Sequence, residues 1–153
     1  MIYLTADTHF NHTNIIKYCQ RPFQTVEEMN EALIANWNKG VRINDMVIFL
    51  GDLCFKEDAD IWLAKLNGDK LIIRGNHDKT GKTDTKFEYC NEMFLLTHKR
   101  MPIVGRNIWN IHGHSHDKGI LIDRGNRSMC ISTELTEYTP ISIERLLSLR
   151  DKA

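Results

Sequence analysis

The sequence predicts an α/β fold in which a sheet is covered by other elements on both of its faces. Short apolar runs rich in β-branched residues alternate with stretches of helical periodicity along the 153 residues. Runs that are apolar at every position, instead of at every second one, are typical of strands buried on both faces. A hydrophobic content of 42% supports a core of ordinary size, and the length predicts one domain over residues 1–153.

The apolar runs are short enough to be strands, and each is bounded by polar residues or glycine. We predict strands at residues 1–5 (MIYLT), 46–50 (MVIFL), 70–74 (KLIIR), 93–97 (MFLLT), 107–111 (NIWNI) and 127–132 (RSMCIS).

Three stretches have the periodicity of helices. Residues 30–40 place Leu33, Ile34 and Trp37 at helical spacing before Gly40. Residues 56–68 begin with acidic side chains and end at Asn-Gly, as helices often do. Residues 141–153 follow a proline and form an amphipathic pattern. We expect the three tryptophans to belong to the core, at positions Trp37, Trp62 and Trp109.

The composition argues against several classes of protein. Lys plus Arg and Asp plus Glu number 20 each, so a long nucleic acid bound by charge alone is not expected. There is no apolar run long enough for a membrane span, and the polar start does not resemble a signal peptide. The cysteines are far apart and include no CxxC pair, which predicts buried, inert thiols in a reducing cytoplasm: Cys19, Cys54, Cys90 and Cys130.

Polar side chains of the kind that bind metals follow five of the predicted strands. In open α/β sheets, ligands bind beyond the carboxyl ends of the strands. Ordinary surface polarity does not predict that such side chains follow five strands in turn. The stretch 110–116 (NIHGHSH) alone holds three of the seven histidines. The candidate ligands are Asp7, His9, Asp52, Asn76, His98, His114 and His116.

The chemistry of these side chains predicts two metal ions. Carboxylate, amide and imidazole ligands without thiolate suit manganese, iron, nickel or zinc. Seven ligands exceed the four of a tetrahedral site, whereas two ions fit if Asp52 bridges them. Two divalent ions and two carboxylates leave a charge of about +2, which attracts phosphate and acidifies a bridging water. His77 is then a candidate general acid, oriented or polarised by Asp78.

The same residues resemble the five-block signature of the calcineurin-like metallophosphoesterases. The blocks occur in the family's order between residues 5 and 116, as Asp7-x-His9, Gly51-Asp52, Gly75-Asn76-His77-Asp78, His98 and Gly113-His114-x-His116. Each block is weak alone, but five in order are highly specific. In one respect the chain departs from the family. The family usually has a small residue or tyrosine and then proline after the histidine of the fourth block, whereas Lys99 and Arg100 follow His98 here.

The resemblance implies a four-layer α/β/β/α sandwich with a dinuclear site at the carboxyl ends of the strands. It implies that one metal is held by Asp7, His9, Asp52 and His116, and the other by Asp52, Asn76, His98 and His114. It also implies that His77 contacts the substrate or its leaving group. Small relatives of this kind usually hydrolyse phosphodiesters with manganese, and this chain lacks the cap domains of larger members.

We therefore predict a metal-dependent phosphodiesterase that cleaves a small, nucleotide-type diester by attack of a metal-bridging hydroxide, with His77 as acid. The alternatives are a phosphomonoesterase or nuclease of the same family, or a non-catalytic metal-binding interaction module. The presence of all seven ligands and His77 favours the enzyme. No membrane partner is expected, and the oligomeric state is left open, with a homodimer among the options.

Three residues after the first block are candidate substrate contacts: Asn11, His12 and Arg21. Arg21 could clamp a phosphate with its planar guanidinium group, or it could form a surface salt bridge. Asn11 could instead cap a helix. His112 lies outside the signature, and we expect it to have a structural role.

Overall fold

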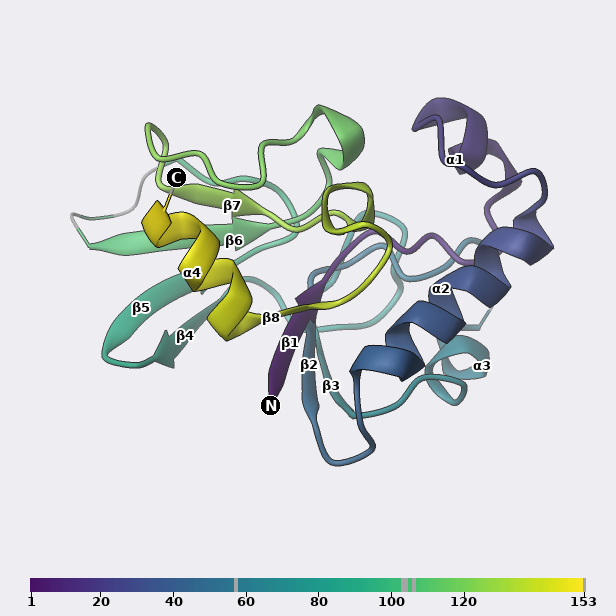
Figure 1. Cartoon of the computed structure of the whole chain (residues 1–153), viewed down its shortest axis with the longest axis horizontal. Coiled ribbons are helices and arrows are strands. Elements are labelled where there is room, and N and C mark those ends of the chain that lie inside the picture. The colour runs from purple at the N-terminus through teal and green to yellow at the C-terminus, as the bar shows by residue number, and fades with distance from the viewer. Residues whose placement is uncertain (57, 103–104, 106, 153) are drawn as a thin grey trace.

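The computed structural model describes residues 1–56, 58–102, 105 and 107–152, and it contains two four-stranded sheets stacked face to face (Figure 1). The first has the strand order β3-β2-β1-β8 and the second β4-β5-β6-β7. The first sheet consists of β1 (Ile2–Thr5), β2 (Met46–Phe49), β3 (Asp69–Ile72) and β8 (Ile141–Ser142). The second consists of β4 (Thr85–Tyr89), β5 (Glu92–Leu96), β6 (Ile108–His112) and β7 (Ser128–Cys130).

The parallel strands carry the predicted ligand segments. β1, β2 and β3 are parallel, with Leu4 opposite Ile48 and Ile48 opposite Leu71. β5, β6 and β7 are also parallel, with Leu96 opposite Ile111. The edge strands β8 and β4 run antiparallel to β1 and β5. The carboxyl ends of the three parallel strands within each sheet therefore lie at one edge of that sheet.

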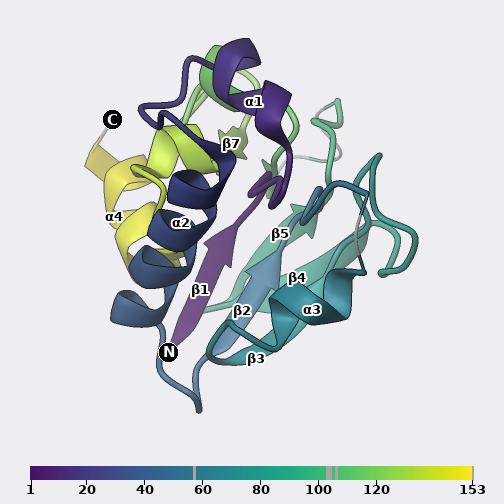
Figure 2. The same cartoon turned by 90° about the vertical axis from the view of Figure 1, so that its right-hand side faces the viewer.

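Four α-helices accompany the sheets: α1 (Thr13–Tyr18), α2 (Val26–Gly40), α3 (Ala59–Leu63) and α4 (Ile143–Lys152). α2 and α3 cover the outer face of the first sheet (Figure 2). Trp37 packs there near Phe49, and the ring of Trp62 stacks on Phe10 at 4.7 Å. Two short 3-10 helices, η1 (His116–Lys118) and η2 (Thr133–Thr136), lie in the connections.

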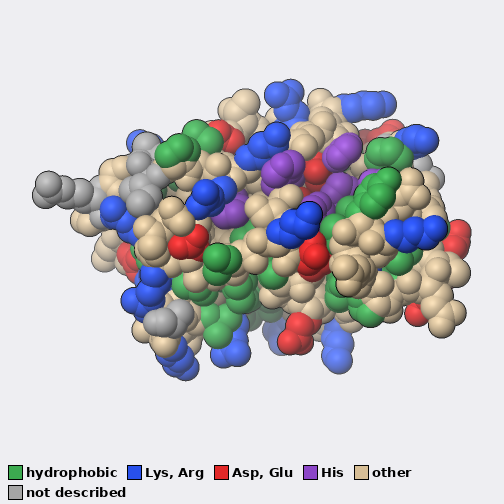
Figure 3. Space-filling view, turned by 90° about the horizontal axis from the view of Figure 1, so that it is seen from above, with side chains coloured by type: hydrophobic (Ala, Val, Ile, Leu, Met, Phe, Trp, Pro, Cys, Tyr) green, Lys and Arg blue, Asp and Glu red, His purple; other side chains and the backbone are tan. Residues whose placement is uncertain are grey.

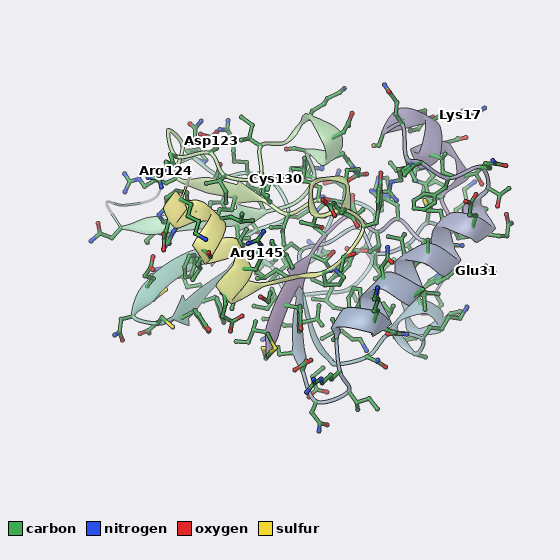
Figure 4. The ribbon with its side chains drawn as sticks, viewed as in Figure 1. Lys17, Glu31, Asp123, Arg124, Cys130 and Arg145 are labelled. Carbon is green, nitrogen blue, oxygen red and sulfur yellow. The ribbon has the colours of Figure 1, made fainter. Side chains whose placement is uncertain are left out.

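The second core lies between the two sheets. It joins Leu4, Ile48 and Ile73 of the first sheet to Phe94 and Ile111 of the second. α4 closes this core with two buried side chains, and a hydrogen bond of 2.6 Å from Arg124 to the carbonyl of Arg150 ties it to the segment before β7 (Figure 4). The predicted α/β/β/α sandwich is confirmed, and its last helix, α4, packs at the edge of the core between the sheets.

The described helices cover the outer face of the first sheet but not that of the second, and the strands of the two sheets differ accordingly in their pattern of apolar and polar residues. β1 and β2 contribute side chains to the cores on both faces of their sheet, and every position except Thr5 is apolar. β6 instead has Asn110 and His112 on the face turned away from Ile111. The Asn110 side chain accepts from the amide of Met101 at 2.8 Å and donates to Thr97 at 2.9 Å, so it holds the segment after β5 against this face.

Helix boundaries differ from the prediction where caps decide them. α2 begins at Val26 because the hydroxyl of Thr25 accepts from the amide of Glu28 at 3.1 Å. α3 covers only residues 59–63 of the predicted 56–68, because Asp58 caps it from outside; Glu57 lies outside the described residues. The last predicted helix starts after the two-residue β8, and Ala153 is likewise not described.

Among the elements that were not predicted are β4 and α1, besides the short β8, η1 and η2. β4 has the sequence TKFEY, in which polar and apolar residues alternate at a half-buried edge. α1 has six residues and buries only Ile15. Both lack the continuous apolar signal by which the other strands were identified. In the described part of the chain, no helix is long and apolar enough to cross a membrane.

Candidate metal centre

Six of the seven predicted ligands meet beyond the carboxyl ends of β1, β2, β5 and β6, whereas Asn76 follows β3 and is exposed. Figure 3 shows histidine side chains gathered on this face, with a carboxylate between them and lysine and arginine side chains around them. Among the described residues, the histidine and carboxylate ligands fall into two groups whose ligand atoms lie within 4.8 Å of one another. We call these groups the Asp7 cluster (Asp7, His9 and His116) and the Asp52 cluster (Asp52, His98 and His114).

The Asp7 cluster is deeply buried. Asp7 and His9 are 0% and 2% exposed, and the ring centroids of His9 and His116 are 5.1 Å apart. Burial raises the pKa of Asp7 to about 6 and lowers that of His9 to about 3. Asp7 therefore ionises at a higher pH than an exposed carboxyl group does, whereas His9 stays neutral and has its lone pair available.

The Asp52 cluster is more polar. Nε2 of His98 lies 3.4 Å from Oδ2 of Asp52 and 3.2 Å from Nδ1 of His114. Burial alone would raise the pKa of Asp52, but hydrogen bonds from the His98 ring and the His77 amide hold it below its usual value. Burial would lower the pKa of His98, but its hydrogen bond with Asp52 raises it. These groups attract one another before any metal binds.

Asp52 lies between the two clusters. Its Oδ2 atom is 3.6 Å from Nε2 of His9 in one cluster and 3.4 Å from Nε2 of His98 in the other. Asp7 also reaches across, because its Oδ2 accepts from the amide of His114 at 2.8 Å. The two clusters are therefore contiguous, with Asp52 in contact with a histidine of each.

The backbone of the centre is strained where the ligands sit. Asp7, His9, Asp52, His114 and His116 all have positive φ angles, between 48° and 68°. Such conformations are uncommon outside glycine and occur often at functional sites. They turn each side chain out of its strand direction and into the centre.

Two glycines of the signature allow the segments to approach closely. A Cβ atom at Gly113 would lie 2.6 Å from Cβ of Ala6 and 2.7 Å from Oδ2 of Asp7. A Cβ atom at Gly75 would overlap the carboxylate of Asp52. The glycine beside each ligand therefore has a local steric reason.

The donor atoms fit a metal. In the described chain, Oδ1 of Asp7 and Nε2 of His9 are buried without a hydrogen-bond partner. Unsatisfied buried polar atoms are rare, and each calls for a ligand or another physical reason. Nδ1 of His98 lies 2.8 Å from the carbonyl of Leu50, which leaves Nε2 of His98 free to face Asp52 and His114.

Glu134 is a residue of the centre that the sequence did not reveal. Its Oε1 lies 3.0 Å from Nδ1 of His116 and accepts from Nε and Nη2 of Arg21 at 2.9 and 2.7 Å. Burial alone would raise the pKa of Glu134, but the hydrogen bond with His116 and the charge of Arg21 lower it to about 2. With Nδ1 of His116 directed at Glu134, its Nε2 is available to a metal.

Arg21 is not placed to clamp a phosphate, and the prediction of a substrate contact is wrong. It is 4% exposed, and Nη1 and Nη2 donate to the carbonyls of Thr8 and Asp7 at 2.8 and 2.7 Å. Together with Glu134 these acceptors engage all three nitrogens of its guanidinium group. The alternative of a surface salt bridge is also wrong, because the ion pair is buried.

Asn11 and His12 lie beside the Asp7 cluster. Asn11 has a φ of 59°, and its amide donates to the side chain of Asn30 at 3.1 Å. Nδ1 of His12 lies 3.5 Å from Nδ1 of His9, and burial lowers its pKa. His12 is therefore close enough to meet a ligand of the centre, and Asn11 mainly shapes the turn.

His77 reaches the centre from the solvent side. Its side chain is 42% exposed, and its Nε2 lies 4.0 Å from Oδ2 of Asp52. A cavity of about 360 Å³ opens beside it, lined in part by Leu53, Lys56 and Lys79. This is an accessible imidazole next to the candidate ligands, as a general acid requires.

Asp78 holds the loops around His77. Its carboxylate accepts from the amides of Asp52, Leu53 and Gly75 at 2.7, 3.0 and 2.8 Å. Its recorded hydrogen bonds thus go to the backbone, which gives Asp78 a positioning role on the Asp52 loop. The amide of His77 in turn donates to Oδ1 of Asp52 at 2.9 Å, so the segment that carries Asn76 is fixed to Asp52. Asn76 itself is exposed.

His112 has the structural role that we expected. It is 3% exposed on the outer face of β6, and its Nδ1 lies 2.8 Å from the carbonyl of Gly113. Burial lowers its pKa. Three of the four cysteines are buried as predicted, whereas Cys90 in the turn between β4 and β5 is exposed.

The carboxylates and imidazoles gathered beyond the strand ends are side chains that suit divalent metal ions. A family model described as calcineurin-like phosphoesterase matches residues 1–150. The chain belongs to the calcineurin-like phosphoesterase family, as the resemblance of its five blocks predicted. This family is metal-dependent and hydrolytic, and the two clusters are its candidate metal ligands in this chain.

The chain is also similar to individual proteins of known sequence or structure. The chain is 45% identical to the uncharacterized protein MJ1445 of Methanocaldococcus jannaschii over 161 residues, covering 99% of this chain and 92% of the relative. The crystal structure of AQ665 from Aquifex aeolicus, a protein of unknown function, superposes with a TM-score of 0.73 at 25% identity, over 97% of this chain and 98% of that one. Vps29 from Entamoeba histolytica, crystallised with zinc, shares the fold with a TM-score of 0.50 at 19% identity, over 84% and 72% of the two chains.

Proposed function

We propose that the protein is a dinuclear metal-dependent phosphodiesterase acting on a small, nucleotide-type diester. The observation that carries the proposal is that Asp52 contacts a histidine of each cluster. In the Asp7 cluster, Oδ1 of Asp7 and Nε2 of His9 are also buried without a hydrogen-bond partner among the described residues. Manganese is the first candidate, and iron, nickel and zinc suit the same side chains. The zinc bound by the related Vps29 supports metal binding in this fold.

We assign the ligands as the sequence predicted. Asp7, His9, Asp52 and His116 would hold one ion, and Asp52, Asn76, His98 and His114 the other. When bound, two such ions withdraw charge from the phosphate oxygens and lower the pKa of a water nucleophile. Glu134 orients the His116 ring, and Arg21 fixes Glu134.

His77 donates a proton to the leaving oxygen. Its ring is accessible to solvent and lies next to Asp52, so it can reach an oxygen of a phosphate seated at the centre. An alkoxide is a poor leaving group, so its departure from a diester depends on protonation by such an acid. A good leaving group departs without this help. Asp78 keeps His77 in place through the backbone of the Asp52 loop.

A phosphomonoesterase or nuclease of the same family is the alternative reaction, and a non-catalytic binding module is the alternative class. The balanced charge argues against a long nucleic acid. The presence of every ligand and of an accessible His77 argues for catalysis. We also propose a reducing cytoplasm as the location, because the four cysteines are far apart in the sequence and include no CxxC pair.

The first experiment compares bis-p-nitrophenyl phosphate with p-nitrophenyl phosphate on metal-stripped protein, with and without Mn²⁺. We expect manganese to restore cleavage and the diester to be preferred. Preference for the monoester would support the alternative reaction. No turnover with two ions bound, as measured by elemental analysis, would support the binding module.

His77→Ala tests the acid separately. We expect a loss of about 10²–10⁴-fold in kcat for a diester with an alkyl leaving group, and a smaller loss for p-nitrophenolate, which leaves without protonation. Metal content should be unchanged. Equal losses for both leaving groups would remove His77 from the role of acid.

A further inference from the structure

Aromatic rings form one flank of the candidate metal centre. We call Tyr18, His12 and Phe55 the aromatic flank. His12 stacks on Phe55, with centroids 4.2 Å apart and planes 16° apart, and Tyr18 meets His12 edge-on at 6.3 Å. The flank starts at the centre itself, because His12 lies 5.4 Å from the His9 ring and Phe55 lies 5.8 Å from the His77 ring.

Packing does not account for these rings. Tyr18 is 68% exposed, and neither Tyr18 nor Phe55 belongs to the two hydrophobic clusters formed by the described residues. α1 is anchored by Ile15, so Tyr18 is not needed to hold it. Figure 2 shows α1 above the carboxyl ends of the first sheet, and Figure 3 shows hydrophobic side chains beside the open histidines. An exposed aromatic side chain next to such a centre marks a ligand-binding surface.

The position of the flank relates it to the leaving group. If His77 protonates the leaving oxygen, the group attached to that oxygen extends from His77 toward its neighbour Phe55. The His12 ring lies 5.4 Å from the His9 ring and 6.3 Å from the Tyr18 ring, so the flank leads from the metal-ligand cluster to an exposed aromatic side chain. The ammonium group of Lys56 lies 5.2 Å from the Phe55 ring and adds positive charge for anionic or electron-rich groups.

We propose that the aromatic flank binds a planar aromatic group, such as a nucleobase, carried on the leaving side of the substrate. Tyr18 provides the stacking face, and the stacked pair of His12 and Phe55 supports it. Stacking of a base on an aromatic side chain tolerates different bases because every base has a π face. This inference rests on the proposed function and specifies the substrate class of the same site.

The test measures binding to the manganese-loaded full chain by calorimetry, with AMP and ribose 5-phosphate as probes. The two differ only by the base. We expect AMP to bind roughly tenfold more tightly than ribose 5-phosphate. Tyr18→Ala should remove most of this difference by weakening AMP alone, and Tyr18→Phe should restore it. Ile43→Ala, which removes another exposed apolar side chain, is the matched control and should change neither affinity.

Equal binding of the two probes by the unchanged protein would overturn the inference. It would also be overturned if Tyr18→Ala weakened both probes equally or neither. Because the readout is binding, these outcomes are separate from the hydrolysis assay. A protein that cleaves diesters but binds both probes equally retains the proposed function and loses the aromatic subsite.

Discussion

The Asp7 cluster and the Asp52 cluster lie side by side, but different kinds of contact support them. Behind the Asp7 cluster is a buried ion pair of side chains, Arg21 and Glu134, which are 113 residues apart. The Asp52 cluster is supported mainly through backbone groups, such as the Leu50 carbonyl on His98 and the amides that bind Asp78.

This difference determines how each cluster responds to substitution. A backbone hydrogen bond survives most changes of side chain, whereas a buried ion pair is lost when one partner changes. We therefore expect the Asp7 cluster to depend on residues outside the family signature. The Asp52 cluster depends mostly on residues within it.

The largest effect is expected where the clusters meet. Asp52→Asn removes the charge shared by both, so metal binding should fail in both clusters and diester hydrolysis should fall by about 10³-fold or more. Elemental analysis and kcat/KM with manganese provide the measurement. Asp69→Asn, at the amino end of β3, is the matched control. Retention of two ions per chain by Asp52→Asn would contradict the bridging role.

Substitution of Glu134 should weaken metal binding in the Asp7 cluster and not in the Asp52 cluster. Glu134→Gln leaves His116 poorly oriented and Arg21 without a charged partner. Manganese affinity should fall by about 10–100-fold in the Asp7 cluster and change little in the Asp52 cluster. A two-phase calorimetric titration would resolve the two sites. Glu31→Gln on α2 (Figure 4) is the control, since that side chain is exposed. Equal weakening of both sites would mean that the clusters are not supported separately.

Asp7→Asn should make the metal-free protein more stable. Burial raises the pKa of Asp7 to about 6, so the folded state holds this proton more tightly than the unfolded chain does. The stability that this proton contributes is fully present below pH 3.8 and is lost as the pH rises through about 6. At pH 7, Asp7→Asn should raise the free energy of unfolding by roughly 1–3 kcal/mol.

Urea denaturation with a chelator at pH 7 would measure this effect. The advantage of the variant should disappear toward pH 4. If the variant were less stable than the parent at pH 7, burial of the Asp7 carboxylate would not destabilise the metal-free protein. The same variant should bind metal poorly, so stability and function would change in opposite directions.

The smallest effect is expected at Asn11, next to the Asp7 cluster. Glycine adopts a φ of 59° without steric cost, so Asn11→Gly should change the free energy of unfolding by no more than about 0.5 kcal/mol and leave kcat/KM nearly unchanged. Asn11→Ala should cost about 1–2 kcal/mol for its backbone conformation. A large loss of kcat/KM in Asn11→Gly, with normal stability, would restore Asn11 as a substrate contact.

Local signals account for the parts of the fold and site that the sequence predicted. Strands such as β1 and β2 are apolar at every position but Thr5 because both faces of their sheet pack against apolar cores, and the ligands follow them closely. β4 escaped prediction because an edge strand needs only one buried face. Arg21 was misassigned because an arginine near a ligand block has the same local sequence whether it faces a phosphate or a buried carboxylate.

The sequence alone therefore determined six of the eight strands in the described chain, the order of the ligand blocks, the family and the glycines beside some of the ligands. Each of these depends on residues close together in the chain. Only the tertiary structure decided that Glu134 lies behind His116, that Arg21 is buried against it, and that Tyr18 stands open beside the centre. The physical reason is that such contacts join segments with no shared periodicity, and the two sheets must pack before any of these partners meet.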